Sequence, residues 1–174
     1  MRGLVNWAEF KKAAPKLART AEELFDRTGV VLLGTVRKDG GPRISPVEFV
    51  FLAGELYVGM MPQSLKARDL LRDARCTVHS AVADRMAKHG EFKLYGRARQ
   101  VRGAQERKRY GLALKKKIGW NPEEGGIPYH LFAIDVSTAA YFRNQAHQRH
   151  LWLWRSRGRI KRFVQGIQGE LKEI

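Results

Sequence analysis

Apolar residues near the start of the chain recur at the spacing of one helical face. Within residues 6–27 they stand three or four positions apart, which is the period of a helix with one buried side. These residues are Trp7, Phe10, Ala14, Leu17, Ala21 and Leu24. Pro15 is tolerated in the first turn of a helix, so it divides the segment into two short helices. Gly29 is well placed to end the second helix.

The pattern then changes to short apolar and β-branched runs that end in turn residues. Asp39-Gly40 and Ala53-Gly54-Glu55 predict two tight hairpins in a row, which are typical of an antiparallel meander. Helices are predicted over Met61–Asp73 and Gly103–Lys117. The predicted strands are Val30–Arg37, Pro42–Leu52, Leu56–Met60, Cys76–Ala81, Glu91–Val101 and Tyr129–Val136, with further extended pieces at Ala139–Arg143, Leu151–Trp154 and Arg159–Val164.

This order of elements predicts the fold class. Six or more strands, joined mostly by hairpins and accompanied by few helices, indicate a mainly β protein. We expect a six-stranded antiparallel barrel, closed or nearly closed, with peripheral helices. The chain is predicted to be a single domain overall, in which residues 1–28 form a helical segment packed on the barrel and residues 29–174 form the barrel domain.

Composition narrows the class of protein. Of 174 residues, 44% are apolar, so the chain can bury a core and wholesale disorder is excluded. Cys76 is the only cysteine, so no intrachain disulfide can form and a cytoplasmic location is expected. The longest apolar runs, such as Val30–Leu33, have the length of a strand and fall well short of a membrane span.

The charge is large and unevenly distributed. The net charge is +16, of which +4 lies in residues 1–75 and +12 in residues 76–174. Residues 143–162 contain seven basic side chains and no acidic one. Such an excess is compatible with nucleic-acid binding. It is equally compatible with a solvated surface that faces small anions or another subunit.

A candidate anion site lies where the third predicted strand meets the following helix. Ser64 is a suitable N-cap, and the helix start offers unpaired N–H groups and the positive end of the helix dipole. Lys66 adds a full positive charge in the first turn. Arg43, on the second predicted strand, would add a bidentate partner if that strand lies adjacent. Together these groups suit a phosphate monoester, although an ordinary capped helix with a nearby lysine has the same pattern.

The second predicted strand contains a proline, Pro46. Because proline cannot donate to a strand ladder, this strand is expected to be irregular or to lie at an edge there. Ser45 and the unpaired backbone would then be free to meet the polar rim of a planar heterocycle. An edge strand that ends in proline for solubility is the alternative.

Several sequence stretches, in this order, resemble one known family. They are Val-Val-Leu-Leu-Gly-Thr-Val, Lys-Asp-Gly-Gly-Pro-Arg-Ile-Ser-Pro-Val, Gly-Glu-Leu-Tyr-Val-Gly and Ser-Leu-Lys-Ala-Arg-Asp-Leu-Leu-Arg-Asp-Ala-Arg. The chain resembles the pyridoxamine 5′-phosphate oxidase-like family of FMN-binding split β-barrels. The resemblance is good over residues 22–102 and looser over 129–136, and residues 64–70 are its most specific part.

The resemblance implies a homodimer with two FMN-binding sites at the subunit interface. Ser64, Lys66 and Arg43 match the residues that hold the FMN phosphate in the family. The residues that match the flanks of the isoalloxazine are Ile44, Ser45, Pro46 and Val47. Those that match the ribityl chain and ring are Tyr57, Val58, Gly59 and Met60, with Pro62 and Gln63 close by.

The C-terminal third departs from the family's namesake oxidase. The tryptophan- and arginine-containing motif that grips the substrate phosphate in that enzyme is replaced by Trp152-Leu153-Trp154-Arg155, which indicates another substrate. Trp152, Trp154 and Arg155 are candidates to pack over the flavin of the partner subunit. Equally, both tryptophans would serve as core or dimer anchors.

The main functional hypothesis is therefore an FMN-dependent oxidoreductase that moves hydride between the flavin and a nicotinamide or a small, anionic substrate. The sequence identifies no catalytic acid or base and no metal site. Two alternatives on the same fold use a deazaflavin coenzyme, whose anionic tail suits a basic rim, or haem, with His147 and His150 as candidate ligands. A basic β-barrel that binds nucleic acid is the less favoured alternative from another class.

Overall fold

A computed structural model describes the chain except for residues 1–2, 83, 86, 146–147 and 167. Its helices are α1 (Trp7–Ala13), α2 (Pro15–Asp26), α3 (Leu65–Arg72) and α4 (Ala104–Ile118). Pro15 begins α2, as predicted. Asn6 and Glu9 form a reciprocal cap at the start of α1: the Glu9 N–H donates to Asn6 Oδ1 at 2.9 Å and the Asn6 N–H donates to Glu9 Oε2 at 3.0 Å.

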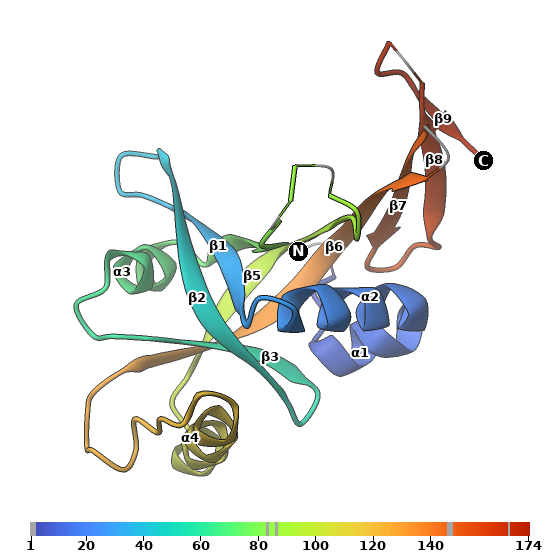
Figure 1. Ribbon diagram of the computed structural model, residues 1–174. Helices are drawn as coiled ribbons and strands as arrows, with labels where there is room; N and C mark the ends of the chain where they lie inside the picture. Colours follow the sequence, from blue (N-terminus) through green and yellow to red (C-terminus); the bar gives the residue numbers. More distant parts are fainter. Residues whose placement is uncertain (1–2, 83, 86, 146–147, 167) are drawn as a thin grey trace.

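Six antiparallel strands close into a barrel, which confirms the predicted fold class (Figure 1). Their order in the sheet is β3-β2-β1-β4-β5-β6, and a ladder between β3 and β6 closes the ring. The six are β1 (Val30–Val36), β2 (Pro42–Leu52), β3 (Glu55–Met60), β4 (Arg75–Ser80), β5 (Glu91–Val101) and β6 (His130–Gln145).

The sixth strand differs from the prediction. The sequence indicated a break between Val136 and Ala139, but β6 runs unbroken through this stretch for 16 residues. At the break Gly96 pairs with Val136 and Tyr95 with Thr138, so Ser137 is an extra residue in a β-bulge. The apparent gap is therefore a change of register within one strand.

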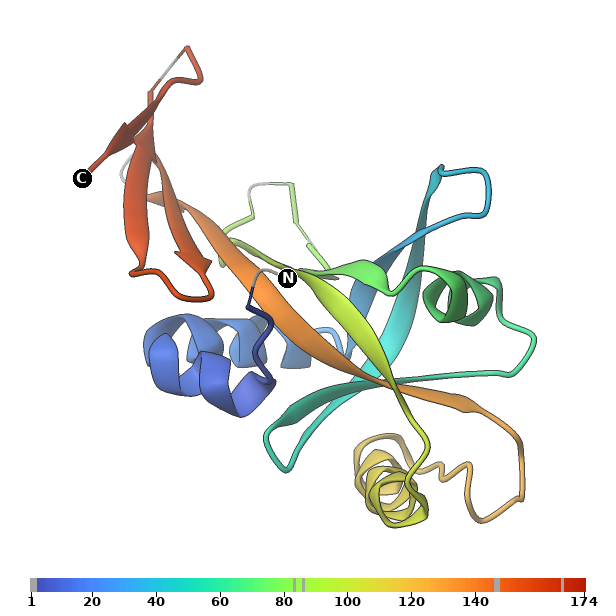
Figure 2. The ribbon, with the colours of Figure 1, turned by 180° about the vertical axis from the view of Figure 1, so that it is seen from behind.

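Three further strands extend the sheet beyond the barrel. They are β7 (Gln148–Arg155), β8 (Lys161–Gln165) and β9 (Leu171–Glu173), added in that order to the end of β6. Figure 2 shows them as an arm that leaves the barrel beside α1 and α2 and carries the C-terminus away from it. The last of these three strands, β9, was not predicted from the sequence.

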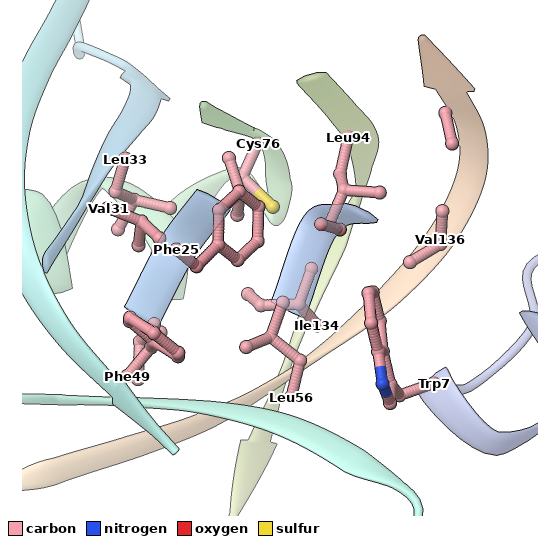
Figure 3. Close-up of a cluster of buried hydrophobic side chains, with 14 of the residues drawn as sticks. Trp7, Phe25, Val31, Leu33, Phe49, Leu56, Cys76, Leu94, Ile134 and Val136 are labelled. Carbon is pink, nitrogen blue, oxygen red and sulfur yellow. The ribbon is translucent and has the colours of Figure 1, made fainter. Parts of the chain in front are cut away.

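The barrel interior and the two N-terminal helices share one hydrophobic core (Figure 3). Phe25 of α2 is fully buried and meets Phe49 of β2 with ring centroids 5.7 Å apart. Trp7 and Phe10 of α1 belong to the same cluster, so α1 and α2 cover one opening of the barrel. A second, smaller cluster lies between α4 and the barrel and contains Tyr57 and Tyr110.

Among the residues that the structure describes, no helix is both long and apolar enough to cross a membrane.

Candidate functional site

The start of α3 has the features of an anion site. Ser64 occupies the N-cap position with extended backbone, but its side chain makes no capping hydrogen bond. Its Oγ is buried and has no hydrogen-bond partner among the described residues. The first turn of α3 contains no acidic residue, so nothing neutralises the positive end of the helix dipole. A buried hydroxyl beside free N–H groups is a set of donors that suits a phosphate.

Lys66, in the first turn of α3, adds a charge that is not neutralised. Its side chain is half-buried, and within the described part of the chain it has neither an ion pair nor a hydrogen bond. The neighbouring Gln63 instead accepts a hydrogen bond from Arg68 through Oε1. Ser64 and Lys66 therefore present one hydroxyl and one cation at the same helix start.

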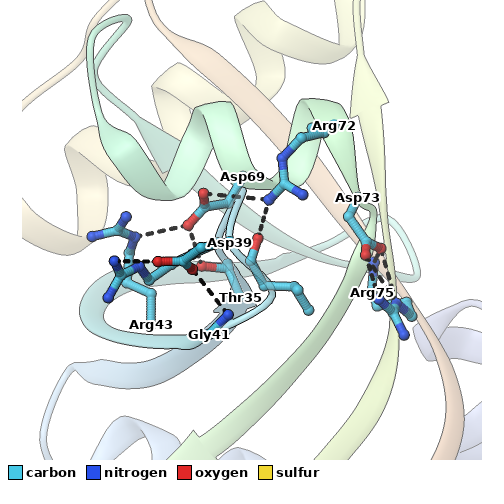
Figure 4. A network of polar contacts seen from close by, with 10 residues as sticks. Thr35, Asp39, Gly41, Arg43, Asp69, Arg72, Asp73 and Arg75 are labelled. Carbon is cyan, nitrogen blue, oxygen red and sulfur yellow. Dashed lines mark hydrogen bonds and ion pairs between the residues drawn. The ribbon is translucent and has the colours of Figure 1, made fainter.

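Arg43 ties β2 to α3 through a buried carboxylate (Figure 4). Its Nε donates to Asp69 Oδ2 at 2.7 Å, and the same oxygen accepts from the Thr35 hydroxyl at 2.9 Å. Burial alone would raise the pKa of Asp69, but the hydrogen bonds from Arg43 and Thr35 outweigh it and hold the pKa below its usual value. Asp69 is therefore an ionised link between β1, β2 and α3.

A positively charged groove of about 670 Å³ lies along this link, between the β1–β2 hairpin and α3. Arg43 and Leu65 both line it, so the groove brings the predicted strand cation beside the first turn of α3. Its other charged residues are Arg37, Lys38, Asp39, Arg68, Asp69 and Arg72. The cations outnumber the acids, so the groove favours an anionic occupant.

The first half of β2 is an open edge, as Pro46 predicted. Residues 42–48 pair with β1, and pairing with β3 begins only at Phe49. Ile44 is 71% exposed and Pro46 is also exposed, whereas Ser45 is half-buried and Val47 is buried. Ile44 and Pro46 thus lie on the outer face of the barrel, where a planar ligand has access to them and to the unpaired backbone.

The predicted residues of β3 turn most of their side chains inward. Val58 and Met60 belong to the main core. The Tyr57 hydroxyl lies under α4 and donates to Glu106 Oε1 at 2.6 Å. Any contact of these three residues with a ligand outside the barrel would therefore be made by their backbone. Gly59, which lacks a side chain, lies against the Tyr110 hydroxyl.

The C-terminal tryptophans have different surroundings. Trp154 is 2% exposed and packs on Phe10 with ring centroids 4.8 Å apart, so it is a core residue of its own chain. Trp152 is half-buried beside Tyr141, at 5.3 Å between ring centroids, and Arg162 lies over its ring. Arg155 is exposed. Of these three residues, Trp152 and Arg155 have exposed surface that is accessible to a partner subunit.

Only one of the two candidate haem ligands, His150, lies in the described part of the chain. His150 stacks on Trp152 with ring centroids 5.8 Å apart, and His147 lies outside the described residues. Among the residues described, no group of three or more His, Cys, Asp or Glu side chains is arranged to hold a metal ion. Burial raises the pKa of the Cys76 thiol to about 12, so this residue is an inert core side chain.

Two parts of this region were not predicted from the sequence. Asp69 and Thr35 were missed because the contacts of Asp69 with Arg43 and Thr35 span 26 and 34 positions. The α4 residues that line a cavity next to Gly59 were also missed. The four-residue spacing of Tyr110 and Leu114 was the available signal, and it indicates only a helix face.

The fold and the site together define a split β-barrel with a candidate anion site at the start of α3. Residues 17–143 match the family model described as pyridoxamine 5′-phosphate oxidase, and the chain belongs to this family. No curated protein matches the chain.

Solved structures share the fold at low sequence identity. A protein of the pyridoxinephosphate oxidase family from Clostridium acetobutylicum, related to general stress protein 26, is 14% identical, with a TM-score of 0.61 over 80% of this chain and 93% of that one. A heme-binding protein from Mycobacterium smegmatis is 18% identical, with a TM-score of 0.63 over 81% of this chain and 58% of that one. The heme storage protein of Vibrio cholerae is 16% identical, with a TM-score of 0.58 over 70% and 90%.

Proposed function

We propose that this protein binds FMN and acts as an oxidoreductase that transfers hydride between the flavin and a small substrate or a nicotinamide. The observation that carries the proposal is the start of α3, where the buried Ser64 hydroxyl has no partner among the described residues and Lys66 has no counterion among them. A phosphate group would satisfy the hydroxyl and neutralise the charge in one step. Membership of the family supports FMN as the source of that phosphate.

The protein's own residues would bind and orient the cofactor. Ser64, Lys66 and the first N–H groups of α3 would hold the phosphate, and the Arg43–Asp69 pair would fix the distance between β2 and α3. The open edge of β2 at Ile44 and Pro46 would support the ring system. A bound flavin supplies hydride and electron transfer, which the side chains themselves do not provide.

The groove between the β1–β2 hairpin and α3 supports a second candidate, a deazaflavin coenzyme. Such a coenzyme carries a polyanionic tail, and the groove begins beside Leu65 with an excess of cations. A tail of carboxylates would lie along Lys38 and Arg68, beyond the phosphate position. FMN remains the first candidate because it requires only the groups at the start of α3.

We further infer a homodimer with the cofactor at the subunit interface. The outer face of β1, β4 and β5 is hollowed over about 810 Å³, and Leu32, Gly34 and Tyr95 are among the residues that line it. Tyr95 is 44% exposed in the single chain. Ile44 lines the same hollow, so a second copy seated there would reach the open edge of β2.

The predicted cytoplasmic location is consistent with the single buried thiol of Cys76.

The test is the absorption spectrum of the purified protein, followed by release of the chromophore on denaturation. A flavin spectrum with about one FMN per chain supports the proposal. The sharper test compares Lys66→Ala with Lys12→Ala, which removes the same charge from an exposed position on α1. Lys66→Ala should lose bound FMN while Lys12→Ala retains it.

Three outcomes would contradict the proposal. Full FMN occupancy in Lys66→Ala would show that the phosphate lies elsewhere. A haem spectrum in the purified protein would favour haem binding, as in two of the structural neighbours. A colourless protein that binds DNA with a steep salt dependence would favour the nucleic-acid alternative.

A further inference from the structure

A cavity of about 210 Å³ lies between α4 and the barrel, next to the proposed flavin site. Gly59 and Met60 at the end of β3 form one side of it, and Tyr110 of α4 and Tyr129 form another. Glu48, the last residue of the open edge of β2, also lines it. The cavity therefore opens beside the same strand ends that would carry the cofactor ring.

Most of the cavity wall is aromatic or aliphatic. The rings of Tyr110 and Tyr129 are stacked, with centroids 6.0 Å apart and planes inclined by 25°. Leu114, one helical turn from Tyr110, is 2% exposed, and Trp120 lines the cavity while remaining 42% exposed. Flat walls of this kind favour a planar, apolar occupant.

One buried hydroxyl gives the cavity a polar group. Tyr129 is 8% exposed, and its Oη is buried beside the Glu123 carboxylate without a close hydrogen bond in the described part of the chain. Burial raises the pKa of Tyr129 and that of Tyr110, so both hydroxyls are protonated at neutral pH. A ligand with one polar atom on its ring would satisfy the Tyr129 hydroxyl.

The charge of the cavity is opposite to that of the whole chain. Glu48 is the one charged side chain among the residues that line it. Two cations of α4 are engaged elsewhere: Arg107 lies 3.9 Å from the ring centroid of Tyr129 and pairs with Glu123, and Lys117 pairs with Asp26. A carboxylate or phosphate in this cavity would face Glu48 with no cation on the cavity wall.

We propose that this cavity binds a small, planar aromatic molecule that carries a polar group but no negative charge. A volume of about 210 Å³ admits one or two fused rings. The position of this molecule beside the flavin rests on the proposed function, whereas its binding to the cavity does not. This ligand carries no negative charge, although the net charge of +16 on the chain suggested an anionic ligand.

The test is a matched pair of probes, 2-naphthamide and 2-naphthoate, which share one ring system and differ in charge. Binding is measured by calorimetry on the unaltered protein and on Lys66→Ala, where a lost flavin does not affect the cavity wall. Because Glu48 is exposed and water screens its charge, the amide should bind about two- to fivefold more tightly than the carboxylate. Loss of FMN from Lys66→Ala tests the flavin proposal, and probe binding to the same variant tests the cavity. Either proposal can therefore fail without the other.

Two variants show which atoms are responsible. Glu48→Lys should reverse the preference, so that 2-naphthoate binds more tightly, whereas Glu23→Lys makes the same charge change at an exposed position of α2 and should leave the preference unaltered. Tyr129→Phe should weaken 2-naphthamide severalfold. The proposal is overturned if neither probe binds, if the carboxylate binds as tightly as the amide, or if Glu48→Lys behaves like Glu23→Lys.

Discussion

Replacement of Asp69 by alanine tests the link between β1, β2 and α3. Asp69 is 6% exposed and accepts hydrogen bonds from Thr35 at 2.9 Å and from Arg43 at 2.7 Å. The substitution leaves the Thr35 hydroxyl, in a residue only 4% exposed, without its partner, and it leaves the Arg43 guanidinium without a buried counterion. It therefore removes a connection and leaves two polar groups unsatisfied.

The size of the effect follows from how far water can replace the carboxylate. Hydrogen bonds to a charged group contribute about 1.5–3 kcal/mol each. The Arg43 side chain is 26% exposed, so water can solvate part of it and its share lies at the lower end. We expect a total loss of about 3 kcal/mol in the free energy of unfolding, or roughly 6–12 °C in Tm for a chain of this size.

Urea unfolding followed by tryptophan fluorescence measures this loss, and Asp26→Ala is the control. The Asp26 side chain is 62% exposed and pairs with Lys117 at 3.1 Å, so its replacement should change stability little. A loss of less than about 1 kcal/mol in Asp69→Ala would refute the reasoning.

The effect of Asp69 should also depend on pH. Its pKa is lower in the folded chain than in the unfolded chain, so its stabilisation is present above the ordinary aspartate pKa of about 3.9 and is lost as the pH falls through the folded value. The stability difference between the unaltered protein and Asp69→Ala should therefore shrink in acid. A constant difference down to pH 2 would contradict this assignment.

Two further predictions concern the core. Trp154→Ala should lower the free energy of unfolding by about 3–5 kcal/mol, because the ring is buried against Phe10; thermal unfolding measures this, and a loss below about 1 kcal/mol would place the ring outside the core. Cys76 should resist iodoacetamide at pH 8 in the native protein and react fully in urea, because burial raises its pKa to about 12; rapid native labelling, followed by mass spectrometry, would contradict its burial.

Local sequence signals predicted the local structure well. Pro15 predicted the division between α1 and α2. Pro46 predicted the open edge of β2. Each of these signals acts within a few residues of itself, through a missing N–H donor or a fixed dihedral angle, so one sequence was enough to interpret it.

Features that depend on distant contacts were not predictable in the same way. Ser64 was expected to cap α3, but its hydroxyl is left without that bond, and only the folded chain shows this. Arg43 was assigned to a phosphate, and nothing local indicates that its Nε meets Asp69. The cavity between Tyr110 and Tyr129 also requires the packing of α4 against the barrel.

The bulge at Ser137 determines where β6 can change its length. Before the bulge, Phe132, Ile134 and Val136 face the core at even positions, and after it Ala139 and Tyr141 do so at odd positions. Removal of Ser137 alone would place Val136 and Ala139 two positions apart, so both would still face the core of a regular strand. A deletion or insertion of one residue elsewhere in β6 would instead turn the residues that follow it to the opposite face, so natural variants should change the length of β6 at the bulge and not on either side of it.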